Sequence, residues 1–421
     1  MMSFCLIPAM LFTVLAFLVM QGYLPCIREL QMALKSEATG SQEFTPPARV
    51  ILCLRGADPF LDRCLKGLAS QDYPNYKVLI VVDSLQDDTI PQVESHLRKY
   101  GNDQFEVVIR DRTLPYCTRK LSSLLCGLSL VPAEVEIVAM CDADAIPHVT
   151  WLRELVAPLL DPQTVAASGN RWYAPSMLTM GGLCRYHWNS LAFRVMHKYR
   201  IPWAGSMAMR GELFRDPEFL DRLQHSFSDD TALAGYLASK KQHSTSIVSL
   251  VILNEENCGL RNFWGFLIRQ ILAARLHHPR WMEILIEALV IFAVMWVLLP
   301  LAIFQSVTHS DWSSVGWWFV GGAIYDVIVL ATIGYFEWLV RKLLWQRRQQ
   351  RATPYDWKRN CLAAPGLFLT GLIYPIAVIV SVFIRKHEWR GVLYRIEAHG
   401  ISTLCESDKL AASRTAQNWS I

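Results

Sequence analysis

Two aspartates, Asp142 and Asp144, follow an apolar run that ends at Cys141, and Pro147 comes soon after them. A run that is apolar on both faces is typical of a buried parallel strand. At the carboxyl end of such a strand, residues i and i+2 lie on one side, facing the crevice where open α/β sheets bind ligands. Two carboxylates in one crevice favour a hard cation such as Mg²⁺ or Mn²⁺. The pair therefore predicts a metal–diphosphate site, with an acidic turn in which Asp142 caps the next helix as the alternative.

A third aspartate, Asp83, also follows an apolar run. The apolar runs before the one that ends at Cys141, and the helical stretches between them, lie at residues 49–54, 60–70, 76–82, 105–109 and 119–130. This alternation predicts an α/β sheet with mainly parallel strands over residues 49–260. Two acidic strand ends in one sheet favour a nucleotide-binding crevice at its carboxyl edge.

The composition indicates a protein with a membrane portion. Of the 421 residues, 52% are hydrophobic, which is too apolar for an ordinary soluble enzyme. The net charge of +4 is modest and gives no reason to expect nucleic acid as a partner. The eleven cysteines form no CxxC pair and no His/Cys cluster, so zinc and redox motifs are not expected. Several of them lie inside predicted strands, which fits a reducing cytosolic location for the globular part.

Apolar stretches near both ends of the chain predict membrane helices. The first, at residues 4–20, has neither a basic region before it nor a small-residue cleavage site after it, which favours a retained anchor. The expected organisation is an N-terminal transmembrane anchor (1–24), a linker (25–48), the α/β domain (49–260), an interfacial helix (261–282), a membrane region with about three transmembrane or re-entrant segments (283–400) and a polar tail (401–421).

Basic residues between the C-terminal apolar stretches indicate the topology. The three stretches lie at residues 284–307, 315–340 and 363–384, and each is long enough to span a bilayer. The first connecting loop has no Lys or Arg, whereas residues 341–359 have seven, which predicts a multi-pass protein with a cytoplasmic α/β domain. Three crossings then put the C-terminus outside, yet the basic residues after the last stretch favour the inside. Proline and glycine within the last stretch allow a re-entrant or broken segment, so the C-terminal topology stays open.

Several motifs occur in the order and spacing found in family 2 glycosyltransferases of the GT-A fold. They are residues 48–54, Gln-Asp-Tyr-Pro at 71–74, Val-Val-Asp-Ser at 81–84 and Cys-Asp-Ala-Asp at 141–144. The segments at residues 118–124, 228–230 and 389–394 resemble the ceramide glucosyltransferase branch, including its bacterial hopanoid- and glycolipid-linked relatives. The resemblance covers residues 45–280 and weakens in the membrane region. It implies an α/β GT-A nucleotide-diphospho-sugar transferase domain with N-terminal and C-terminal transmembrane helices.

The resemblance implies that four residues bind the donor. Asp83 would hold the uracil or ribose of a UDP-sugar, and Lys120 would neutralise phosphate charge. Asp142 and Asp144 would hold Mg²⁺ or Mn²⁺ against the diphosphate, where the metal serves as a Lewis acid for the departing UDP. A solvated surface lysine is the alternative for Lys120.

The acidic pair Asp229 and Asp230 stands before a predicted helix. The family has two acids at this place, and Asp230 matches the second, which is the general base. In an inverting transfer, a carboxylate takes the proton of the acceptor hydroxyl while the hydroxyl oxygen attacks the anomeric carbon, so no covalent nucleophile is required. Capping of the helix by Ser228 or Asp229 is the structural alternative for one of these acids.

The expected interfacial helix carries a broken form of the family motif (Gln/Arg)-x-x-Arg-Trp. Arg269 matches the motif arginine, which would aid the departure of UDP by meeting the charge that develops on the diphosphate. Phe266 replaces the first residue of the motif, and Gln270 replaces the tryptophan. Arg275 is the alternative, and either arginine would otherwise be a cation that extends from the helix to the membrane surface.

The expected function is the transfer of a hexose, glucose by family resemblance, from a UDP-sugar to the hydroxyl of a membrane lipid such as ceramide. Aromatic side chains in residues 171–200 favour a membrane-facing region that admits the lipid, with core packing as the alternative. A processive polysaccharide synthase is the second hypothesis, which the broken motif and the modest number of spans disfavour. A non-catalytic membrane scaffold is the third, which the intact acidic residues disfavour.

Overall fold

The computed structural model describes residues 7–36, 44–101, 103–310, 312–348, 350, 357–396 and 402–405. Its central feature is a seven-stranded sheet with the order β3-β2-β1-β4-β6-β5-β7. The strands are β1 (Ala48–Leu54), β2 (Tyr76–Val82), β3 (Phe105–Ile109), β4 (Ile137–Cys141), β5 (Ala166–Tyr173), β6 (Ser206–Arg210) and β7 (Ser244–Asn254). Strands β1 to β4 pair in parallel, and β6 runs antiparallel to both β4 and β5. This mixed sheet with flanking helices fits a GT-A fold and confirms the expected α/β class.

Helices cover both faces of the sheet, which is why its central strands are apolar throughout. Val50 and Leu52 of β1 belong to a core shared with α3 (Leu61–Ala69) and α6 (Trp151–Val156). Ile51 of β1 and Val138 of β4 belong to a second core shared with α5 (Arg119–Ser129), α9 (Pro217–Gln224) and α10 (Asp229–Ser239). The remaining elements of the domain are α4 (Ile90–Tyr100), the short 3-10 helix η1 (Ala157–Leu160), α7 (Met180–Tyr199), α8 (Gly211–Phe214) and α11 (Leu260–His277).

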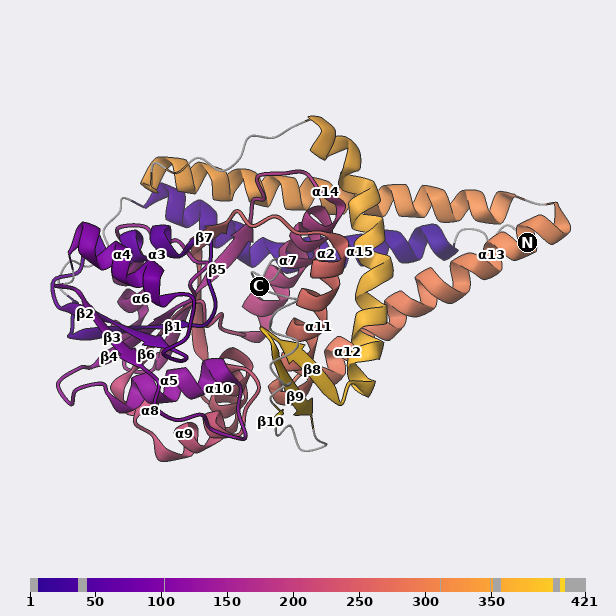
Figure 1. The fold of residues 1–421 in the computed structure, drawn as a ribbon. Coiled ribbons are helices and arrows are strands. Elements are labelled where there is room, and N and C mark those ends of the chain that lie inside the picture. The colour runs from indigo at the N-terminus through magenta and orange to yellow at the C-terminus, as the bar shows by residue number, and fades with distance from the viewer. Residues whose placement is uncertain are drawn as a thin grey trace.

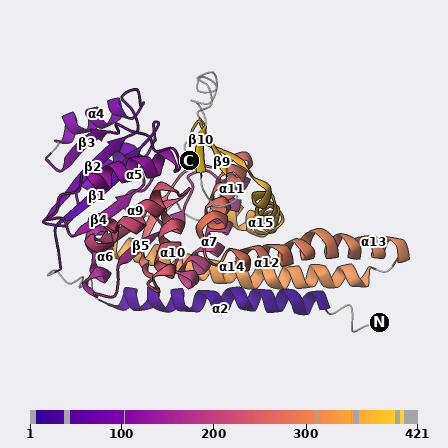
Figure 2. The ribbon, with the colours of Figure 1, turned by 90° about the horizontal axis from the view of Figure 1, so that it is seen from below.

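Within the described residues, four helices are long and apolar enough to cross a membrane. They are α2 (Ile7–Lys35), a continuous helix made of α12 (Trp281–Phe292), the π-helical turn η2 (Ala293–Leu298) and α13 (Leu299–His309), then α14 (Ser313–Arg348) and α15 (Trp357–Phe383). Helices α2, α14 and α12–α13 project together from the α/β domain, whereas α15 runs across them (Figures 1 and 2). Long apolar helices of this kind indicate a membrane protein.

Helix α2 is longer than expected, because residues 25–35, which we expected to belong to a linker, are helical. Pro25 lies inside the helix without ending it. Cys26 and Leu30 are fully buried in a core that α2 shares with α14 and the α/β domain, and this packing extends the helix beyond its apolar first half.

The chain after α15 returns to the α/β domain and forms a small antiparallel sheet from β8 (Lys386–Trp389), β9 (Val392–Ile396) and β10 (Ser402–Cys405). Arg390 and Gly391 connect β8 to β9 with φ angles of 48° and 71°, the positive values of a tight two-residue hairpin turn. Residues 386–396 were expected within the membrane region and 402–405 within a polar tail. They form strands instead because each segment pairs with its neighbour in register; the rest of the tail lies outside the described residues.

Candidate functional site

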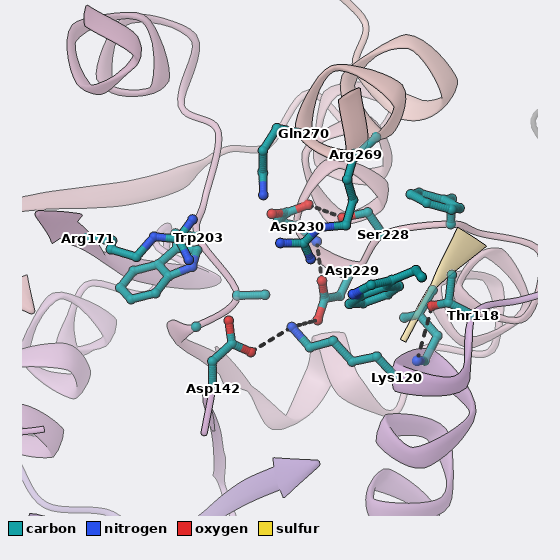
Figure 3. Close-up of a pocket in the computed structure, with 16 residues that line it drawn as sticks. Thr118, Lys120, Asp142, Arg171, Trp203, Ser228, Asp229, Asp230, Arg269 and Gln270 are labelled. Atoms are coloured by element: carbon teal, nitrogen blue, oxygen red, sulfur yellow. Dashed lines mark hydrogen bonds and ion pairs between the residues drawn. The ribbon is translucent and has the colours of Figure 1, made fainter. Parts of the chain in front are cut away.

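A polar cavity opens at the carboxyl end of β4, and we call it the first cavity (Figure 3). Its charged lining comes from five elements far apart in the chain: Lys120, Asp142, Arg171, Asp229, Asp230 and Arg269. A second cavity adjoins it, shares Lys120, Asp142, Arg171 and Arg269, and continues past Asp144 to Asp83. The five residues that we expected to bind donor, metal or acceptor proton, and Arg269 from the interfacial helix, therefore line one continuous site.

Lys120 lies at the centre of the first cavity. Its ammonium group is 2.8 Å from Oδ1 of Asp142 and 3.0 Å from Oδ2 of Asp229 (Figure 3). Thr118 caps the helix that carries it by accepting a hydrogen bond from the Leu121 amide, which fixes the start of α5. Burial disfavours the charged ammonium, but the two carboxylates outweigh burial and raise the pKa of Lys120. Lys120 is thus a fixed positive charge inside the site and not a solvated surface residue.

The carboxyl group of Asp142 remains ionised for the complementary reason. Burial opposes its ionisation, yet the charges of Lys120, Arg171 and Arg269 outweigh burial and lower its pKa below the usual value. The surrounding cations thus make Asp142 a permanent anion at the point where the two cavities meet.

Gly205 supports Asp142 from the neighbouring strand end. The Asp142 amide donates to the Gly205 carbonyl at 3.3 Å. A Cβ atom on Gly205 would lie 2.6 Å from Oδ2 of Asp142 and 2.3 Å from the ring of Trp203, distances that real Cβ atoms do not show. The close approach of chain and carboxylate therefore requires glycine at this position.

Asp144 and Asp83 mark the far part of the second cavity. Asp144 accepts a hydrogen bond from the Asn254 side-chain amide at 3.1 Å and lies 3.8 Å from the Arg171 guanidinium. Asp83 is buried, and its two oxygens bind Arg55 and Arg110, the latter at 2.5 Å. Both aspartates are therefore held in place by protein donors at the lining of the second cavity.

The residues present fit a divalent metal bound together with a substrate. Among the described residues, no three His, Cys, Asp or Glu side chains come together as a complete metal site. Mg²⁺ sites in enzymes that bind nucleoside phosphates commonly use one or two carboxylates, with phosphate and water as the other ligands. Asp142 and Asp144 both line the second cavity, so they supply this carboxylate pair.

Asp230 differs from its neighbour Asp229. Oδ1 of Asp230 accepts hydrogen bonds from the Ser228 hydroxyl and, at 2.6 Å, from the Thr231 amide. Burial and the charge of Asp229 raise the pKa of Asp230 to about 6. Asp229 is instead paired with Lys120. Ser228 is the first residue before α10, but its side chain bonds to Asp230 and caps no backbone amide.

Arg269 and Gln270 extend into the first cavity from α11 (Figure 3). Burial and the nearby Arg171 lower the pKa of the Arg269 guanidinium. Arg275, the alternative to Arg269, points elsewhere, because its guanidinium donates to the carbonyls of Ser381 and Ile384 at the end of α15. The structure thus separates a cavity arginine from an arginine that joins two helices.

The hairpin β8–β9 contributes side chains whose roles the sequence did not predict. Trp389 lines both cavities, and the Arg269 guanidinium lies over its ring at 4.9 Å. The Tyr394 hydroxyl accepts a hydrogen bond from the Arg119 amide at 3.2 Å, at the start of α5. Arg390 accepts from the Arg55 guanidinium through its carbonyl. The only sequence signal was the resemblance at residues 389–394, which assigned no contact to any of these residues.

Two further residues of the site were missed. Arg171 is the one charged residue of the largely buried strand β5, and its guanidinium stacks on the Trp203 ring at 5.2 Å. A charged residue in a buried strand was a usable signal. The ring of His277 accepts a hydrogen bond from the Phe227 amide at 2.8 Å and so fixes the segment that precedes Asp229 and Asp230. No pattern in the sequence connected His277 with that segment.

Comparisons with known proteins give one family. The model of glycosyl transferase family 21 matches residues 10–402. Among solved structures, a Pyrobaculum calidifontis mannosyltransferase in complex with GDP-Man and Mn²⁺ has a TM-score of 0.47 and 16% identity, covering 90% of this chain and 98% of that one. A Mycobacterium tuberculosis glucosyl-3-phosphoglycerate synthase has a TM-score of 0.36 and 14% identity, covering 55% of this chain and 81% of that one. No curated protein sequence matches the chain.

Proposed function

Because the chain belongs to glycosyl transferase family 21, we propose that it is a membrane-bound inverting enzyme that transfers a hexose, glucose in our expectation, from a UDP-sugar to a lipid hydroxyl. The observation that carries this proposal is the pairing of two unlike acids beside one cavity. Asp142 has a lowered pKa among three cations, and Asp230 has a pKa raised to about 6. Carboxyl groups whose environments push their pKa values apart are typical of sites that divide binding and proton transfer between two acids.

We assign the donor to the second cavity. Its two ends are Asp83, for the uridine, and the Asp142–Asp144 pair, for the diphosphate. Lys120 and Arg269 line the same cavity and offer positive charge to the phosphate oxygens. A divalent ion held by Asp142 and Asp144, Mg²⁺ or Mn²⁺, would supply Lewis-acid stabilisation of the departing UDP.

We assign the acceptor hydroxyl to the first cavity, beside Asp230. There the hydroxyl oxygen forms its bond to the anomeric carbon as the bond from that carbon to the phosphate oxygen breaks. The proton goes to the Asp230 carboxylate, whose pKa of about 6 leaves it ionised yet basic at neutral pH. Arg269 meets the negative charge that grows on the leaving diphosphate, and the Trp389 ring beneath its guanidinium holds it in place.

A lipid acceptor is supported by the membrane helices that adjoin the site. Helix α11, which carries Arg269, leads directly into α12, the first part of a helix that is apolar enough to cross a membrane. A water-soluble donor and a membrane acceptor thus reach the site from its two sides. The seven basic residues within 341–359 support a cytoplasmic α/β domain under the positive-inside rule.

A donor and acceptor screen tests this function. Membranes containing the protein receive radiolabelled UDP-glucose, UDP-galactose or UDP-N-acetylglucosamine with extracted lipids, with and without EDTA, and Asp230→Asn membranes serve as the control. We expect label from UDP-glucose in the organic phase, lost with EDTA and strongly reduced in the control. Label in an insoluble polymer would instead establish the polysaccharide synthase, and binding of UDP-sugar without any turnover would favour the scaffold.

A further inference from the structure

The two helical segments before α15 leave the α/β domain and return to it. Helix α12 starts at the domain, where the Tyr199 hydroxyl of α7 donates to Glu283 at 2.6 Å. Helix α14 ends at the domain, where the Arg348 guanidinium donates to the carbonyls of Val251 at 2.6 Å and Ser249 at 2.9 Å. Helices α12–α13 and α14 thus form one outward and one returning segment, and both meet at the far end of the bundle (Figure 1).

The segment after α15 also lies at the domain. The Arg390 side chain donates to the Arg55 carbonyl and is 3.7 Å from Asp58, next to the end of β1. The Tyr394 hydroxyl binds the first turn of α5. Near the start of α15, the Arg359 guanidinium lies over the Tyr186 ring of α7 at 4.4 Å. Both ends of α15 are therefore on the domain side of the bundle, although its length of 27 residues and its hydropathy are those of a membrane span.

Helix α15 is also oriented differently from the projecting helices. It crosses them at a steep angle in Figure 1 and is seen nearly along its axis in Figure 2, where they lie in the plane of the picture. One face of it packs closely against α7: a Cβ atom on Gly366 would lie 2.6 Å from the Leu183 side chain. Arg275 of α11 holds its C-terminal carbonyls, and the Trp296 indole donates to the Leu372 carbonyl at 3.1 Å.

The opposite face of α15 is apolar and exposed. Phe368, Val380 and Phe383 are 46%, 37% and 76% exposed, and they lie along one stripe of the helix. Basic residues stand at both ends of the helix, Lys358 and Arg359 before and Arg385 and Lys386 after it. Basic residues at both ends are expected when both ends stay on the cytoplasmic face.

We propose that α15 does not cross the bilayer but lies along the membrane surface on the side of the α/β domain, with the stripe of Phe368, Val380 and Phe383 in the lipid. Three segments then cross the membrane: α2, α12–α13 and α14. Helices α12–α13 and α14 cross the membrane outward and back, so the chain is again on the cytoplasmic side where α15 begins. The basic residues after α15 then lie on the cytoplasmic side, as the positive-inside rule favours. The exposed stripe contacts the acyl boundary of the leaflet, as amphipathic interfacial helices do. This inference concerns placement and does not depend on which substrates the enzyme uses.

Epitope tags test the sidedness. The full chain carries one tag after Gly101 in the α/β domain, between α13 and α14, or after Ile421, and each is probed with protease in sealed vesicles. We expect the tags at Gly101 and Ile421 to be cut from the same side, and the tag between α13 and α14 from the opposite side. An Ile421 tag that is cut together with the one between α13 and α14 would overturn the proposal.

Membrane depth tests the orientation. A fluorescent amino acid is incorporated at Phe368, Ile376 or Val380, and its depth is measured by quenching with lipids labelled at known positions. Because twelve residues of helix are about 18 Å long, a crossing helix would separate Phe368 from Val380 by that depth. We expect all three positions within a few Å of one another, and a probe at Ile376 much deeper than both neighbours would show a re-entrant segment instead.

A matched control comes from α14. Phe319 and Ala331 are also exposed and twelve residues apart, on a helix that we place across the membrane. The same probe at these two positions should differ in depth by about 18 Å, reduced only by helix tilt. Equal depths on α14 together with a gradient on α15 would reverse the assignment of the two helices.

Discussion

Replacing Asp230 by Asn should remove catalysis and stabilise the fold at the same time. Burial and the charge of Asp229 raise the pKa of Asp230 from its ordinary value of 3.8 to about 6, so the folded protein holds a proton on Asp230 that the unfolded chain has already lost. The fold is therefore most stable below pH 3.8 with respect to this group, and it loses that stability as the pH rises through about 6. At roughly 1.4 kcal/mol per pKa unit, the loss at neutral pH is about 3 kcal/mol. Solvent in the cavity screens part of it, so this value is an upper limit.

The Asp230→Asn variant is neutral at every pH and avoids this cost. We expect it to unfold at a higher temperature than the unmodified enzyme at pH 7, with the difference disappearing toward pH 4. Loss of a general base should lower the transfer rate by roughly 10²- to 10⁴-fold. The unmodified enzyme should show kcat/KM falling about tenfold per pH unit below pH 6, as Asp230 becomes protonated.

The assay combines thermal unfolding in detergent from pH 4 to 8 with initial rates of sugar transfer over the same range. Asp229→Asn is the matched control, because it removes the neighbouring charge and keeps the base. In this variant the fall of kcat/KM on the acid side, which we call the acid limb, should move to lower pH, because the charge of Asp229 no longer raises the pKa of Asp230. Wild-type transfer by Asp230→Asn, or an unchanged acid limb in Asp229→Asn, would refute the assignment of Asp230.

Three further changes test other parts of the site. Trp389→Ala should lower kcat about tenfold, because the contact between the Trp389 ring and the Arg269 guanidinium is lost, and Trp389→Phe should keep part of the lost activity. Equal effects of the two variants, or a change in melting temperature without a change in kcat, would exclude a role of Trp389 in holding Arg269. Gly205→Ala should weaken the affinity for UDP, measured by calorimetry with Mn²⁺, by at least about tenfold, because the new methyl group collides with the Asp142 carboxylate and the Trp203 ring. An unchanged affinity would contradict the close contact between Gly205 and Asp142. Removal of the metal with EDTA should abolish UDP binding to the unmodified protein, and Asp144→Ala should weaken it even with excess metal; binding unaffected by both would exclude a metal-bridged donor.

The sequence predicted those features that depend on local pattern. The run at residues 76–82 coincides with β2, because a strand buried on both faces must be apolar throughout. The resemblance, and not local pattern, implied that Lys120 and Asp142 both face the donor, and in the structure their charged groups are 2.8 Å apart. The motif arginine Arg269 also reaches the site, from a helix more than a hundred residues later.

Features that depend on contacts between distant segments could not be predicted in this way. Nothing in the sequence around Trp389 and Arg390 indicates that their turn contacts Arg55. The periodicity of apolar residues shows which face of a helix or strand is buried, but it does not show which other segment covers that face. The extension of α2 was missed for the same reason, since Leu30 is buried by α14 and not by its own neighbours in the sequence. The alternatives for Arg275 were separated only by its contacts with α15.

The turn between β8 and β9 has a consequence for the biosynthesis of the protein. Its carbonyl at Arg390 binds the Arg55 guanidinium, which also holds Asp83, so the wall of the second cavity is built from residues made near the beginning and near the end of translation. A ribosome-bound chain that has completed the seven-stranded sheet still lacks this wall. The site is closed only after α12–α13, α14 and α15 have taken their places in the membrane and have carried the hairpin back to the domain. Membrane insertion thus becomes a precondition for a complete donor site, and a chain that stops before β8 should fold its sheet and yet retain a donor site open on one side.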